Sequence, residues 1–205
     1  RNELLANLAE GSLVIGTAWQ RQSGQLEPAC SINSVQQDGR LVIDDSFSAV
    51  CPVVGADGWL VFTGSESSPL LVWVPASQKG LTLDPIKRVD GSSMGRLRLE
   101  SCDVPAHYVL ARGAQARESL SASLDLGRVA QSAQLLGVAR QTFDMTLEYM
   151  RVRVQFDRPI GSFQSLQHKM VDGYIQLQLL AYAVWHAIGL VAQDRSVLAL
   201  QASRL

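Results

Sequence analysis

Cysteine, histidine and long uncharged apolar runs are scarce in this chain, and each scarcity argues against a class of function. The three cysteines, Cys30, Cys51 and Cys102, are too widely spaced for a zinc site or a redox pair, and the three histidines are equally scattered. We therefore expect no metal site, and the few free thiols favour a reduced, cytoplasmic setting. No run of about 18 uncharged apolar residues occurs, which argues against a membrane span.

An excess of charge of one sign is also lacking. The 205 residues hold 18 Lys and Arg against 19 Asp and Glu, and no basic block interrupts the chain. Nucleic-acid binders carry a basic patch or stripe, so we expect no nucleic-acid partner. The first residues show no basic-then-apolar leader, which argues against a signal peptide. The 47% of hydrophobic residues are enough for the core of one large domain or two modest ones.

Short strand-like segments fill residues 11–112. They are rich in β-branched and aromatic residues, and Gly, Pro, Asp or Ser bounds each of them. In residues 96–100 charged and apolar side chains alternate, which is typical of a sheet with one wet face. Because no helical pattern separates these segments, they predict an antiparallel β-barrel or sandwich. The segments are SLVIGTAW, RLVIDDSF, WLVFTG, LLVWVP, GLTLDPI and RLRLESCDV.

From residue 113 onward the hydrophobic period becomes helical. Apolar residues recur every three or four positions over 120–150 with no intervening proline, which predicts a helix of about 35 residues and about 50 Å. A second helical pattern runs over 162–192. The connection DRPIG is short, so the helices should form an antiparallel hairpin within a four-helix bundle. Each helix buries only one face there, so we expect further chain or an obligate oligomer to cover the rest.

The segment RVQFDRPIGSFQSLQ, between the two helical patterns, contains the most informative chemistry. The first helix carries Arg153 and is expected to break at Pro159, and the next helix restarts behind Ser162 as N-cap with Gln164 in its first turn. A permanent cation beside the free N–H groups of a helix start favours an anion such as a phosphate or diphosphate. The alternative interpretation is a solvated arginine at a helix end.

This part of the chain resembles the acyl-CoA dehydrogenase family. The stretch from SLDLGR through RVQFDRPIGSFQSLQ is similar to the family's LD-x-GR, ALG-x-A and R-x-QFG-x-PI-x-x-FQ-x-x-Q motifs, in order and spacing. The segment CDVPA is similar to the family's V-x-VPA strand end. The resemblance implies the end of an N-terminal helical region or a linker at 1–10, a middle β-domain over 11–112 and a partial C-terminal helical domain over 113–205.

The resemblance also implies roles for individual residues. Arg153 matches the arginine that pairs with the FAD diphosphate, usually that of a neighbouring subunit. Gln164 matches a glutamine that contacts the same cofactor, and Phe156 matches the aromatic residue beside it. An arginine fork suits phosphate oxygens, which agrees with the reasoning from the residues themselves. The segment expected to lie along the acyl-CoA substrate consists of Asp125, Leu126, Gly127 and Arg128.

Two segments of the predicted β-domain depart from the family's pattern. The flavin-contacting loop, which usually reads close to A-x-TEPGAGSD, is AWQRQSG here. Gln20 stands where a threonine or serine would contact the flavin, and Arg21 replaces the acidic residue. A second flavin-side segment is expected within residues 45–50, without a secure alignment.

The helical part departs from the pattern as well. Asp157 replaces the glycine after the aromatic residue, and its charge should weaken diphosphate binding unless Arg158 offsets it. In one subgroup of the family the catalytic carboxylate lies on the first long helix, where this chain has Gly127. We therefore identify no catalytic residue in this chain.

Three functions are compatible with this pattern. The first is an FAD-dependent acyl-CoA dehydrogenase, which dehydrogenates an acyl-CoA thioester in fatty acid β-oxidation and passes electrons to a separate acceptor. The second is a non-catalytic, FAD-clamping subunit of a heteromeric dehydrogenase, for example for a steroid or lipid side-chain CoA thioester. The third is a binding or structural module that keeps only the fold. The first two imply a homo- or hetero-oligomer, a dimer or tetramer, formed through the helical domain.

Overall fold

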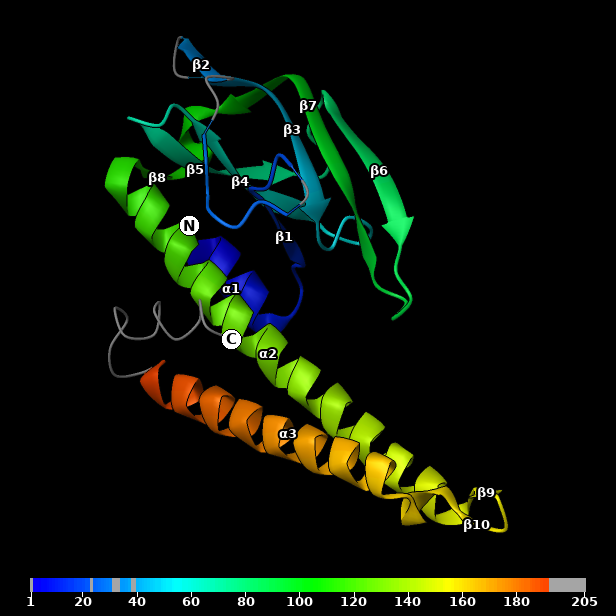
Figure 1. Cartoon of the computed structure of the whole chain (residues 1–205). Coiled ribbons are helices and arrows are strands. Elements are labelled where there is room, and N and C mark those ends of the chain that lie inside the picture. The colour runs from blue at the N-terminus through cyan, green and yellow to red at the C-terminus, as the bar shows by residue number, and fades with distance from the viewer. Residues whose placement is uncertain (1, 23, 31–33, 38–39, 192–205) are drawn as a thin grey trace. The chain divides into compact units, whose positions relative to one another are not determined.

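The computed structural model describes residues 2–22, 24–30, 34–37 and 40–191. The chain divides into two compact units, Arg1–Ser121 and Ala122–Leu205. β-strands dominate the first unit and long helices the second (Figure 1). This mixture of antiparallel sheets and long helices confirms the predicted α+β class. Among the described residues, no helix combines the length and the apolar character needed to cross a membrane.

The first unit contains two four-stranded sheets after a short helix, α1 (Asn2–Glu10). One sheet has the strand order β1-β4-β5-β8 and the other β2-β3-β7-β6. The pairings are antiparallel except between β1 and β4, which run parallel. The strands are β1 (Ile15–Ala18), β2 (Ser34–Gln37), β3 (Arg40–Val50), β4 (Gly58–Gly64), β5 (Pro69–Pro75), β6 (Leu81–Lys87), β7 (Ser93–Pro105) and β8 (Val109–Arg112).

One hydrophobic core draws its side chains from both sheets, as a sandwich requires. Alternation along β3 and β7 turns every second residue inward, and Phe47 and Leu97 are fully buried. Trp59 of β4 is also fully buried and donates its indole N–H to the Pro52 carbonyl at 2.9 Å. Gly16 leaves room for this ring, because a Cβ there would lie 2.4 Å from Trp59 Cδ1.

The second unit is a helical hairpin. Helix α2 (Gly113–Val152) begins in the first unit after β8 and continues into the second, where α3 (Gln164–Leu190) runs back antiparallel to it (Figure 1). A two-stranded ribbon of β9 (Val154–Gln155) and β10 (Arg158–Pro159), followed by a 3₁₀ turn, η2 (Ile160–Ser162), joins them. The hairpin prediction is therefore confirmed. A second 3₁₀ turn, η1 (Ala106–Tyr108), lies between β7 and β8.

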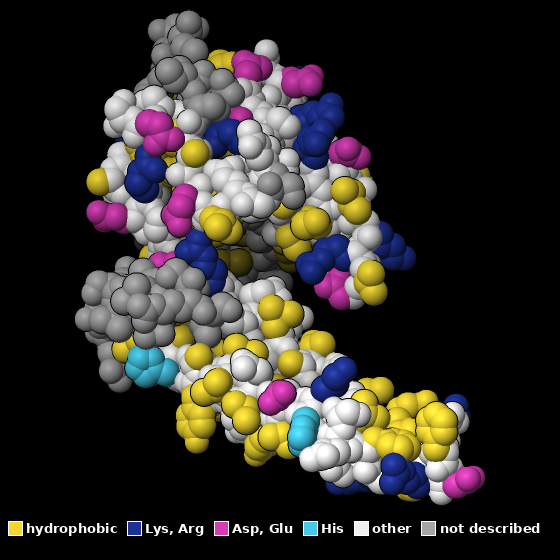
Figure 2. Space-filling model, viewed as in Figure 1, with side chains coloured by type: hydrophobic (Ala, Val, Ile, Leu, Met, Phe, Trp, Pro, Cys, Tyr) yellow, Lys and Arg dark blue, Asp and Glu magenta, His cyan; other side chains and the backbone are white. Residues whose placement is uncertain are grey.

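The two helices touch through few side chains. The Phe143 ring lies 6.0 Å from that of Tyr174, and Val129 packs on Ala187. Many large apolar side chains of the hairpin stay exposed, and Figure 2 shows hydrophobic residues gathered over the helical arm. Helical propensity alone does not hold such faces in water, so this surface is suited to further packing. On the two helices themselves, the most exposed are Met145, Val152, Tyr182 and Trp185.

Candidate functional site

The predicted diphosphate corner forms a tight ribbon between α2 and α3. Gln155 pairs with Arg158 and Val154 with Pro159, so two residues make the turn. These are Phe156 and Asp157, with φ of 55° and 61°. Two successive positive φ values are the mark of a type I′ turn, which usually contains Asn and Gly. Two larger side chains in this backbone conformation indicate a constrained segment.

Arg153 lies where α2 passes into the ribbon. Its backbone N–H donates to the Tyr149 carbonyl at 2.9 Å, and its carbonyl accepts from the Ile160 N–H at 2.8 Å. These bonds fix the backbone, while the residue itself is exposed. Over the described part of the chain, no carboxylate pairs with its guanidinium, whereas Arg151 Nη1 lies 2.5 Å from Glu148 Oε1. Arg153 therefore presents its charge to solvent, as an external anion requires.

The start of α3 differs from the sequence prediction. Ser162 is not the N-cap, because it ends the 3₁₀ turn and its hydroxyl donates to the Pro159 carbonyl at 2.7 Å. Phe163 caps the helix without a side-chain bond, and Gln164 is its first residue. The expected helix start remains, one residue further on. Gln164 and Ser165 stand in its first turn, where N–H groups lack partners within the helix itself.

Two aromatic rings line this corner. Phe156 is 86% exposed and meets Phe163 edge-on, with ring centroids 6.0 Å apart. The Arg158 guanidinium lies 4.2 Å from the centroid of the Phe163 ring. Arg158 therefore stacks on an aromatic face and forms no ion pair with the neighbouring Asp157. Of the three residues predicted to bind the cofactor, Arg153 and Phe156 lie on this connection and Gln164 is the first residue of α3.

The predicted acyl-CoA segment lies elsewhere, on the part of α2 that belongs to the second unit. Arg128 Nη1 lies 2.7 Å from Asp125 Oδ1, and both side chains are partly buried. Leu126 is 45% exposed, and the space around Gly127 is open, since a Cβ there would meet nothing within 4 Å. About 36 Å of helix separates Arg128 from Val152, at the other end of α2. The two predicted sites therefore lie far apart within one chain.

The altered loop of the β-domain contains an ion pair that sequence reasoning missed. Arg21 Nη2 lies 2.6 Å from Asp45 Oδ2, and its Nε lies 3.1 Å from Oδ1. The Asp45 side chain is only 2% exposed and that of Arg21 17%. The guanidinium also donates to the Phe62 carbonyl at 3.3 Å and lies 5.0 Å from the Phe47 ring centroid. An arginine in place of the family's acidic residue was the only sequence signal for this pair.

This pair belongs to a network that joins the two departing segments. The Ser48 N–H donates to the Gln20 carbonyl at 2.7 Å, and the Ser48 hydroxyl donates to the Arg21 carbonyl at 3.1 Å. The Gln20 side-chain amide donates to the Gln25 carbonyl at 2.9 Å. Asp45 also accepts from the Thr63 hydroxyl at 3.3 Å. The polar groups of this corner therefore bond to one another.

A second polar cluster in the first unit holds Cys30. Its N–H donates to Glu66 Oε1 at 2.6 Å, and Arg117 Nη2 lies 2.7 Å from Glu66 Oε2. The Cys30 N–H and Arg117 lower the pKa of Glu66, whereas burial and the charge of Glu66 raise the pKa of Cys30 to about 11. Such a thiol is protonated at neutral pH and is a poor nucleophile. Among the described residues, no group of three or more His, Cys, Asp or Glu is suited to a metal ion.

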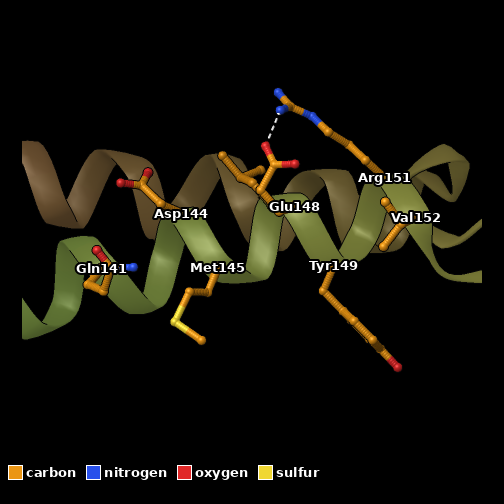
Figure 3. A pocket seen from close by; sticks show the side chains of 8 residues that line it. Gln141, Asp144, Met145, Glu148, Tyr149, Arg151 and Val152 are labelled. Atoms are coloured by element: carbon orange, nitrogen blue, oxygen red, sulfur yellow. Dashed lines mark hydrogen bonds and ion pairs between the residues drawn. The ribbon is translucent and has the colours of Figure 1, made fainter.

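A groove of about 690 Å³ follows the last turns of α2. Among the residues that line it, Met145 and Tyr149 project from one side of α2, while Asp144, Glu148 and Arg151 project from the other (Figure 3). This helix surface thus has an apolar edge beside a charged one.

Comparison with known proteins decides the family. A model of the C-terminal domain of acyl-CoA dehydrogenases matches residues 117–203. Acyl-CoA dehydrogenase FadE27 of Mycobacterium tuberculosis is 33% identical over 139 residues, which are 68% of this chain and 36% of that protein. A mitochondrial 2-methylacyl-CoA dehydrogenase of Solanum tuberosum is 39% identical over 161 residues, 65% of this chain and 39% of that protein. This chain belongs to the acyl-CoA dehydrogenase family.

Solved structures of this family extend the match to nearly the whole chain. The ChsE4-ChsE5 complex of Mycobacterium tuberculosis superposes with a TM-score of 0.79 at 26% identity, covering 96% of this chain and 52% of that one. The steroid ACAD Tcur3481-Tcur3483 superposes at 0.78 and 27%, covering 98% and 54%. The chain therefore spans about half the length of these acyl-CoA dehydrogenase structures and a little over a third of the curated relatives.

Proposed function

We propose that the chain is part of an FAD-dependent acyl-CoA dehydrogenase that removes two hydrogens across the α,β-bond of an acyl-CoA thioester. The observation that carries this proposal is the exposed Arg153, free of any described carboxylate, beside the start of α3 at Gln164. A guanidinium fork, an amide side chain and helix N–H groups form a donor set that matches a diphosphate. The residues present therefore fit the diphosphate half of FAD.

The division of labour follows from the family's chemistry. When bound, FAD would accept the β-hydrogen as a hydride. A carboxylate must remove the α-proton of the thioester, and hydrogen bonds to the thioester carbonyl must stabilise the charge that develops. Gly127 occupies one position where the family carries that carboxylate, so this chain supplies no base there. Its contribution is the clamp at Arg153 and a wall for acyl-CoA at Asp125–Arg128.

The distance along α2 favours an oligomer. Reacting atoms must approach to about 3–3.5 Å, yet about 36 Å of helix separates the acyl-CoA segment from the corner at Arg153. A flavin held at this corner therefore reacts with substrate bound against another subunit. The exposed apolar faces of the hairpin and the groove at Met145 and Tyr149 are suited to such an interface. We propose a dimer or tetramer in the cytoplasm that passes electrons to a separate acceptor.

A second candidate function is a non-catalytic subunit that clamps the FAD of a heteromeric dehydrogenase. The Arg21–Asp45 pair favours it, because a guanidinium paired with a buried carboxylate and bonded to the Phe62 carbonyl stands where the family's loop meets the flavin. Gly127 also favours it, because this position carries no carboxylate and a partner would have to supply the base. Complexes named ChsE4-ChsE5 and a steroid ACAD are among the similar structures, so a steroid or lipid side-chain CoA thioester is the substrate class we propose for this case.

The Arg153→Ala variant of the intact protein tests the clamp. We expect the variant to keep its thermal unfolding midpoint and to lose FAD, read from the ratio of flavin to protein absorbance. Arg151→Ala is the matched control, because Arg151 is two residues away but is paired with Glu148. Unchanged FAD occupancy in Arg153→Ala would show that the clamp is assigned wrongly.

Expression of the protein alone and with a neighbouring paralogue separates the two candidates. Bleaching of the flavin spectrum by acyl-CoA in the lone protein supports the complete dehydrogenase and excludes the silent subunit. Flavin uptake only after co-expression supports the heteromer.

A further inference from the structure

The register of the β9–β10 ribbon places two arginines on one face. Side chains alternate along a strand, and directly opposed residues of an antiparallel pair share a face. Arg158 opposes Gln155, and the Ile160 N–H bonds to the Arg153 carbonyl at 2.8 Å, which continues the same register. Arg153, Gln155 and Arg158 therefore lie on one face, with the two arginines as diagonal neighbours.

Like charges so close together are unfavourable unless something offsets them. In the segments described here, neither Arg153 nor Arg158 pairs with a carboxylate, although the chain pairs other arginines readily, as at Arg151 and Arg128. Asp157 sits between them in sequence, but it occupies the turn and forms no ion pair with either of them. The face is thus a concentrated positive charge that a doubly charged anion would neutralise.

Phe163 fixes where the second charge sits. The central carbon of the Arg158 guanidinium lies over the Phe163 ring, 4.2 Å from its centroid, and Phe163 is the N-cap of α3. Stacking leaves the N–H groups at the edge of a guanidinium free to donate. Arg158 is therefore held against the residue that caps α3, one position before Gln164.

We propose that Arg158 is a second cation of the diphosphate site, which acts with Arg153 on the two phosphates of FAD and is positioned by Phe163. This inference rests on the proposed function and adds a binding residue to it. The positive charge of Arg158 would also offset the negative charge of Asp157, which by itself should weaken diphosphate binding. Arg158 binds through its charge, and Phe163 acts only through Arg158.

Titration of the apoprotein with FAD, followed by flavin fluorescence, tests the assignment in the intact assembly. We expect Arg158→Ala to weaken FAD binding about ten- to a hundredfold, the range for loss of a hydrogen-bonded charge. Arg158→Lys should keep part of the affinity because it keeps the charge, and Phe163→Leu should lose less than Arg158→Ala. Added salt should weaken the wild type more than Arg158→Ala, because the variant makes one ionic contact fewer. Arg151→Ala serves as the control and should bind FAD like the wild type.

The outcomes separate this inference from the function on which it rests. If Arg153→Ala loses FAD while Arg158→Ala binds it like the wild type, the second cation is wrong and the clamp stands. If neither variant loses affinity, the proposed function fails as well. If Arg158→Lys binds as weakly as Arg158→Ala at an equal unfolding midpoint, charge is not what Arg158 supplies, and the proposal is overturned.

Discussion

Arg21 and Asp45 form a two-point ion pair inside the β-domain, with contacts of 2.6 Å and 3.1 Å between their side chains. Asp45 receives two further hydrogen bonds, from the Ser46 N–H at 2.9 Å and the Thr63 hydroxyl at 3.3 Å. A buried carboxylate needs such a cation and such hydrogen bonds, because its removal from water costs several kcal/mol. The pair therefore fixes the segment around Arg21 to strand β3.

The Arg21→Ala variant should be strongly destabilised. It leaves the buried Asp45 carboxylate without its cation, which costs about 3–5 kcal/mol. Thermal unfolding of the purified protein measures this as a lower midpoint. The double variant Arg21→Met/Asp45→Leu should recover most of the loss, because it removes both charges together. Arg40→Ala is the control, since the Arg40–Asp103 pair is about half exposed and is worth at most about 1 kcal/mol. Equal effects of Arg21→Ala and Arg40→Ala would contradict the structural role.

Local pattern was enough to predict the elements that local physics specifies. The period of the apolar residues predicted both long helices and their hairpin, and alternation such as that in β7 predicted strands. The end of α3 at Leu190 lies within two residues of the expected one. The parallel pairing of β1 with β4 did not follow from strand spacing, because that pairing depends on contacts between segments far apart in the chain.

The candidate site was predicted unevenly for a similar reason. Arg153, Phe156 and Gln164 lie within twelve consecutive residues at the bend of the hairpin, so sequence order alone places them near each other. The Arg21–Asp45 pair joins residues from different segments of the chain, and only the folded sheet brings them together. Ser162 was misassigned as N-cap because a 3₁₀ turn intervenes, and such a turn leaves no hydrophobic period to read.

Asp157→Gly should stabilise the ribbon. Asp157 has φ of 61°, a conformation that glycine adopts without the Cβ penalty, so we expect a gain of about 0.5–1 kcal/mol. Asp157→Val should instead lose about 1–2 kcal/mol, because a β-branched side chain clashes at positive φ. The difference between the two thermal midpoints is the measurement. A midpoint for Asp157→Val at or above that of Asp157→Gly would rule out the type I′ turn.

The same substitution should have opposite effects at two glycines. A Cβ on Gly95 would lie 2.3 Å from the Asp84 carbonyl oxygen, so Gly95→Ala must move the β6–β7 pair and should cost about 1–3 kcal/mol. Gly137 lies exposed on α2 with nothing within 4 Å, so Gly137→Ala should gain about 0.5–1 kcal/mol through helix propensity. Circular dichroism melts of both variants report the sign directly. A loss at Gly137 would mean that a partner surface packs closely there.

Thiol reactivity should follow burial. Cys51 is exposed, whereas Cys102 is fully buried, and burial together with the nearby Asp103 and Asp44 raises the pKa of Cys102 to about 11. Because the thiolate is the reactive form, iodoacetamide at pH 8.5 should label Cys51 first and leave Cys102 until the protein unfolds. Mass spectrometry of the peptides gives the order. Labelling of Cys102 as fast as Cys51 in the folded protein would contradict the buried position.

The same raised pKa values predict a loss of stability at alkaline pH. The thiols of Cys30 and Cys102 ionise near their ordinary pKa of 9.0 in the unfolded chain but only near 11 in the folded one. Between these values the unfolded state loses protons that the folded state keeps, so the free energy of unfolding should fall as pH rises from 9 to 11. Below pH 9 the thiols are protonated in both states, so their ionisation takes nothing from the free energy of unfolding there. Cys102→Val removes one titrating group, so its unfolding midpoint should fall less steeply than that of the wild type over this range, and parallel curves would contradict the assignment.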